Sequence, residues 1–62
     1  MTETQITEFI EEIRAELKYL GENQGYITKN LRIPAKRLLC LMNLKAKFKP
    51  DEIEGIKNLL GI

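Results

Sequence analysis

The chain has no histidine, no tryptophan and a single cysteine among its 62 residues. One thiol cannot form a disulfide within the chain, and without histidine it cannot complete the ligand set of a structural zinc site. A nucleophilic role for Cys40 lacks the neighbouring base it needs. Acid–base catalysis by paired carboxylates needs a cleft, for which a chain of this length has little room. The sequence therefore predicts no metal, no cofactor, no small-molecule ligand and no enzymatic activity.

Long hydrophobic runs are also missing, and none approaches the roughly 20 residues that cross a bilayer. Residues 1–4 contain one acid and no base, and no apolar segment follows them, which is not the pattern of an export signal. We expect a cytoplasmic chain without membrane contact, in a compartment where a lone thiol stays reduced. The length allows one domain, spanning residues 1–62.

Acidic residues are absent from the middle of the chain, although the net charge of +1 conceals this. Residues 1–22 carry six acids and two bases, and residues 50–62 carry three acids and one base. The acid-free block, residues 23–49, contains seven bases: Lys29, Arg32, Lys36, Arg37, Lys45, Lys47 and Lys49. Such a block is typical of a surface that meets a polyanion. The alternative is a solvated surface whose basic middle balances its acidic flanks.

Apolar residues recur at spacings of three and four, which predicts a small all-α domain of four, or at most five, helices. The expected helices span residues 4–20, 24–31, 34–44 and 50–60. Thr2 and Gln5 match a capping box, and Asn23 can cap the second helix. The Ile33-Pro34 pair separates the second helix from the third, because the residue before proline avoids the helical region.

The expected core comes from one face of each helix, with Phe48 anchoring the basic loop after the third helix. Tyr19 and Tyr26 are expected to pack at the edge between the first two helices. The predicted inward residues of the helices are Ile6, Phe9, Ile10, Ile13, Leu17, Leu20, Ile27, Leu31, Leu38, Leu41, Met42, Ile53, Ile56 and Leu60.

Two short helices separated by about three residues outline a helix-turn-helix. The stretch 21–33, GENQGYITKNLRI, resembles the lambda-repressor and Cro-like (XRE-type) helix-turn-helix family, with a glycine, then Gln24, then two aliphatic residues and a third in the turn. Leu38, Leu41 and Asn43 match the family's recognition helix, and residues 50–62 resemble its last helix. The resemblance covers residues 9–62. It implies a DNA-binding transcriptional regulator of phage or mobile-element type, such as a repressor.

The resemblance also implies roles for individual positions. The third helix, residues 34–44, would enter the major groove of double-stranded DNA, and a homodimer would bind a two-fold symmetric operator. The residues that would face the bases are Ala35, Lys36, Arg37 and Leu39. The residues that would meet phosphates are Gln24, Asn43, Lys45, Lys47 and Lys49.

Three departures from the family pattern support an alternative to DNA binding. Pro34 stands where a polar cap is usual, and Leu39 and Cys40 are apolar where the family is commonly polar. Leu44 replaces a common glycine, so we expect the turn after the third helix to be built differently. Leu39, Cys40 and Leu44 together predict an apolar strip, and such strips often mark protein partners. The alternative is thus a module that binds a protein partner or a second copy, with little or no DNA binding.

Overall fold

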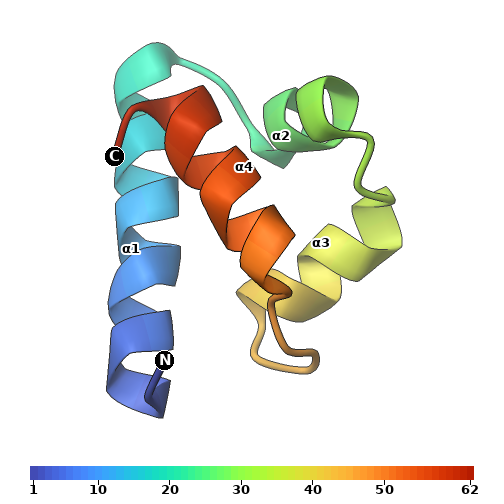
Figure 1. Ribbon diagram of the computed structural model, residues 1–62. Helices are drawn as coiled ribbons and strands as arrows, with labels where there is room; N and C mark the ends of the chain where they lie inside the picture. The colour runs from blue at the N-terminus through green and yellow to red at the C-terminus, as the bar shows by residue number, and fades with distance from the viewer.

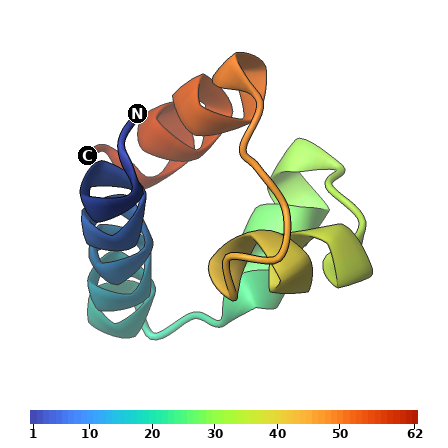
Figure 2. The ribbon, with the colours of Figure 1, turned by 90° about the horizontal axis from the view of Figure 1, so that it is seen from below.

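Four helices make up the computed structural model, which describes all 62 residues. They are α1 (Glu3–Leu20), α2 (Gln24–Leu31), α3 (Ala35–Met42) and α4 (Pro50–Leu60). Helix α4 packs against both α1 and α2, and α2 packs against α3 (Figure 1). The view from below shows α2 and α3 together on one side of the molecule, with the 43–49 loop returning from α3 to α4 (Figure 2). The predicted all-α class is confirmed.

The helix ends follow local signals in the sequence. The Thr2 Oγ1 accepts from the Gln5 N–H at 3.2 Å, and the Gln5 Oε1 accepts from the Thr2 N–H at 2.8 Å, so the predicted capping box of α1 is confirmed. The Asn23 Oδ1 accepts from the Gly25 N–H at 2.9 Å and caps α2. These contacts satisfy backbone donors that an unprotected helix start leaves without partners.

Helix α3 is shorter than predicted, because it begins after Pro34 and ends at Met42. The Leu44 N–H donates to the Leu41 carbonyl at 3.2 Å, and the Lys45 N–H donates to the Cys40 carbonyl at 2.8 Å. These two bonds form a Schellman motif, which requires a left-handed residue. Leu44 supplies it with φ of +62°, so a leucine here takes the left-handed conformation that glycine usually adopts. A side chain in that conformation costs about 1–2 kcal/mol relative to a right-handed residue.

The core gathers one face of every helix. Eleven residues are buried, all of them hydrophobic: Phe9, Ile10, Ile13, Leu17, Ile27, Ile33, Leu38, Leu41, Met42, Ile56 and Leu60. Ile6, Leu31 and Ile53 are half-buried against this core, as is Tyr26. Phe48 also packs on it, with its ring centroid 5.2 Å from that of Phe9 in an edge-to-face arrangement. The loop after α3 is therefore anchored as predicted.

Leu20, predicted to face inward, and Tyr19, predicted to pack at the edge between the first two helices, both face water instead. Leu20 is 43% exposed and Tyr19 is 84% exposed, so neither packs as expected. Both belong to the last turn of α1, directly before the left-handed Gly21. None of the four helices is both long enough and apolar enough to span a membrane.

Candidate nucleic-acid interface

Helix α3 has one face in the core and one face in water. Leu38, Leu41 and Met42 are buried. With 3.6 residues per turn, the opposite side of the helix carries the intervening positions. Four residues predicted to contact DNA are exposed on α3 or at its C-cap: Ala35, Lys36, Leu39 and Asn43. One basic and two apolar residues of this eight-residue helix are thus exposed to the solvent.

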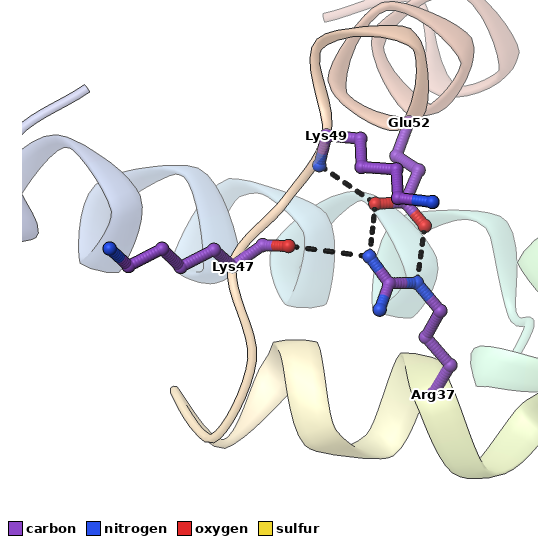
Figure 3. Close-up of polar contacts among 4 residues, drawn as sticks. All are labelled: Arg37, Lys47, Lys49 and Glu52. Carbon is purple, nitrogen blue, oxygen red and sulfur yellow. Dashed lines mark hydrogen bonds and ion pairs between the residues drawn. The ribbon is translucent and has the colours of Figure 1, made fainter.

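Arg37 lies on the flank of α3 and is held by α4. Its Nε lies 2.7 Å from Oε2 of Glu52, and a terminal guanidinium nitrogen lies 2.8 Å from Oε1 (Figure 3). The same nitrogen donates to the Lys47 carbonyl at 3.3 Å. The structure therefore brings Arg37 to the α4 side and not to the group formed by Ala35, Lys36 and Leu39.

Glu52 holds three segments together. Besides the ion pair with α3, its Oε1 accepts from the Lys49 N–H at 2.8 Å and so satisfies a free donor at the start of α4 (Figure 3). The Arg37 bond to the Lys47 carbonyl fixes the loop between the two helices. The amino-acid sequence alone does not reveal the contacts of Glu52 with α3, although an acid in the first turn of a helix is a signal for such a cap.

The electrostatics of the pair follow from these contacts. Hydrogen bonds from Arg37 lower the pKa of Glu52, and the bond from the Lys49 N–H acts in the same direction. The hydrogen bond to Glu52 raises the pKa of Arg37 above its already high value. Both groups stay charged at neutral pH.

The other six bases of the acid-free block stay free of ion pairs, since the Arg37–Glu52 pair is the single one in the chain. All six are exposed: Lys29, Arg32, Lys36, Lys45, Lys47 and Lys49. They lie on α2, on α3 and in the two connections that flank α3. This half of the domain therefore presents uncompensated positive charge to the solvent.

Gln24 and Asn43, the two amide side chains predicted to contact phosphates, differ in how free they are to bind one. Gln24 is half-buried at the first position of α2. Asn43 caps the end of α3, where its Nδ2 donates to the Leu39 carbonyl at 2.8 Å. An amide nitrogen has two hydrogens, so Asn43 retains one donor that a phosphate oxygen can accept.

The three residues of the predicted apolar strip differ in exposure and in surroundings. Leu39 is 54% exposed on the outer face of α3, and Cys40 beside it is half-buried. Leu44 is 51% exposed but lines a separate hollow of about 500 Å³ together with residues of α1 and α4. Leu39 and Cys40 do not line that hollow.

Metal ligands do not gather in this fold. No group of three or more cysteine, aspartate or glutamate side chains lies close enough to hold a metal ion.

Comparisons of the chain with protein-family models, with curated proteins and with solved structures found no match. Any function proposed for the chain therefore rests on its fold and its surface.

Proposed function

We propose that this chain is a DNA-binding transcriptional regulator that places α3 in the major groove. The observation that carries the proposal is the outer face of α3, where Lys36 stands beside exposed Ala35 and Leu39. A major groove is about 12 Å wide and accepts one helix. Lysine can donate to the O6 and N7 of guanine, and apolar side chains can contact the methyl group of thymine.

The free cations around α3 provide the second part of the proposal. Lys45 and Lys49 lie in the loop that follows α3, and both are exposed. Each lysine that neutralises a phosphate releases counterions, so binding is sensitive to salt. Gln24 and Asn43 add uncharged phosphate ligands at the start of α2 and the end of α3. Two copies on a two-fold symmetric operator complete the proposal.

Arg37 has a different role in this proposal from the one the sequence predicts. Its guanidinium already donates to both oxygens of Glu52. A base contact would require it to leave that carboxylate without a partner. We therefore assign Arg37 to the positioning of α3 against α4.

The test is the binding of a labelled generic duplex, followed by fluorescence anisotropy over a series of salt concentrations. The slope of log K against log salt should flatten by about 0.9 for each phosphate contact removed, so Lys45→Ala and Lys49→Ala should each show that change. Lys18→Ala is the matched control, because Lys18 is exposed on α1, away from the acid-free block. An absence of binding at low salt, or an equal effect of Lys18→Ala, would refute the proposal.

A second experiment locates the surface. A backbone amide NMR titration with the same duplex should shift the signals of Gln24, Lys36, Asn43 and Lys45, and the shifts should weaken as salt is added. Selection from random duplexes should give a preferred sequence, and Lys36→Ala should relax the preference at one base pair. Signals that move only on α1 would place the nucleic acid elsewhere and would contradict the assignment of α3.

A second candidate function is a protein-interaction module. The observation in its favour is that two leucines, Leu39 and Leu44, are each about half exposed. In this case the protein partner replaces DNA, and the anisotropy experiment gives no binding. Since Leu44 lines the hollow of about 500 Å³ and Leu39 does not, Leu44 is the stronger starting point for a protein contact.

A further inference from the structure

An apolar hollow opens between the first turn of α1, the 43–49 loop and the start of α4. Six of its nine lining residues are hydrophobic; the full set is Met1, Glu3, Ile6, Leu44, Ala46, Lys47, Phe48, Pro50 and Ile53. Met1 is 62% exposed and Leu44 is 51% exposed. These apolar side chains therefore remain in water when the chain is alone, and covering them is favourable.

Leu44 has a backbone that suits glycine better than leucine. Its φ of +62° lies in the left-handed region, where glycine is not strained. Folding of a single chain gains little from a side chain that is half exposed. A strained residue with an exposed apolar side chain is the kind of feature that accompanies a binding surface.

The charges around the hollow are complementary to each other. Glu3 and Lys47 are its only charged side chains, and they come from different walls, one from α1 and the other from the loop. They are not paired within the chain, since the single ion pair is Arg37–Glu52. In a two-fold dimer every contact between two different residues occurs twice, because each copy contributes each of the two residues once. A hollow with one acid and one base on different walls can therefore pair with a copy of itself.

We infer that this hollow is the contact surface of a two-fold homodimer, with the symmetry axis along the hollow. The Leu44 side chain of each copy covers the apolar lining of the other, and Glu3 of each copy faces Lys47 of the other. A domain as short as this one buries only a small core, and a second copy supplies the missing apolar contact. The inference does not depend on DNA binding. It assigns Lys47 to the dimer, which leaves Lys45 and Lys49 for phosphates.

The first test is the mass of the full chain by sedimentation equilibrium over a wide range of protein concentration. The expected species at high concentration has twice the 7.2 kDa of one chain. Leu44→Gly removes the side chain at a position whose backbone accepts glycine, so it should weaken the dimer at least tenfold and keep the helical circular dichroism spectrum. Leu39→Ala is the matched control, because Leu39 is equally exposed but lies outside the hollow.

The second test exchanges the two charges. Glu3→Lys and Lys47→Glu should each weaken the dimer, and the double variant should restore it. Lys45→Glu, in the same loop but outside the hollow, should leave the mass unchanged. A wild-type chain that stays monomeric at every concentration overturns the inference, and in that case a different partner is the candidate for the hollow. A dimer that survives Leu44→Gly, or one that Leu39→Ala dissolves, also overturns it.

Discussion

Arg37 and Glu52 join α3 to α4 by two parallel hydrogen bonds of 2.7 and 2.8 Å. The side chain of Glu52 is 11% exposed and that of Arg37 is 32% exposed, so the pair lies at the edge of the core. A planar guanidinium that meets both oxygens of a carboxylate fixes direction as well as distance. Together with the buried Leu38, Leu41 and Met42, the pair therefore helps to fix how α3 is rotated against α4.

Replacement of Glu52 by alanine should lower the melting temperature. The loss of its bond to the Lys49 N–H alone should cost about 1 kcal/mol, the usual value for a helix cap. For a domain of this size that corresponds to a fall of about 4–8 °C, and the loss of the ion pair adds to it. Glu54→Ala, an exposed neighbour in the same helix, is the control in thermal unfolding by circular dichroism. Equal melting temperatures for the two variants would show that the Glu52 contacts do not stabilise the fold.

The stabilising effect of Glu52 should disappear in acid. Its pKa in the folded chain lies below the ordinary value of 4.5, because Arg37 and the Lys49 N–H favour the charged form. The stabilisation is then complete above the unfolded pKa and is lost as the pH falls through the folded pKa. Denaturant unfolding should show wild type more stable than Glu52→Gln at pH 7, with the difference shrinking below about pH 4. A difference that is constant down to the acid limit would contradict the lowered pKa.

Gly55→Ala should make the domain more stable. An added Cβ meets the two methyl groups of Leu31 at 3.5 and 3.6 Å, which is ordinary contact distance. Alanine inside a helix is favoured over glycine by about 0.5–1 kcal/mol, and that gain should appear in urea unfolding.

Gly25→Ala should have the opposite effect to Gly55→Ala, because its added Cβ would lie 2.9 Å from the Asn23 Oδ1 that caps α2. It should be destabilising by about 1 kcal/mol, the value of a lost cap. Stabilisation by both substitutions would mean that Asn23 does not cap α2.

Two adjacent leucines of α3 should respond very differently to truncation. Leu38 is fully buried, whereas Leu39 is 54% exposed. Leu38→Ala should cost about 2–5 kcal/mol, enough to unfold a domain of marginal stability. Leu39→Ala should change the free energy of unfolding by less than about 0.5 kcal/mol, as exposed substitutions usually do. Similar losses at both positions, measured by urea unfolding at low protein concentration, would place Leu39 in the core.

Local rules in the sequence account for most of the helix boundaries. The capping box of Thr2 and Gln5, the cap at Asn23 and the first-turn proline of α4 depend on residues within four positions of each other. Such contacts form whenever the helix forms, so spacing alone predicts them. The same holds for the buried residues of α3, whose spacing defines one face.

The remaining features depend on distant parts of the chain. The Arg37–Glu52 pair spans 15 positions, and the sequence offers several acids that could have met Arg37. Leu20 belongs to the apolar stripe of α1 by its spacing, but periodicity does not tell where a neighbouring helix stops covering that stripe. Leu44 breaks the local rule that a left-handed cap is glycine, so only the backbone itself reveals the Schellman motif there.

The unequal placement of charge gives this nearly neutral domain a large electric dipole. Six unpaired cations lie on the side of α2, α3 and their connections, while α1 carries five of the acids. The electric field of a highly charged surface acts on the charge distribution of the domain as well as on its net charge. The field therefore rotates the domain before the two surfaces make contact. At physiological salt this torque acts only within about 8 Å. Near an anionic surface, this charge distribution favours an orientation with α3 toward the surface and α1 away from it.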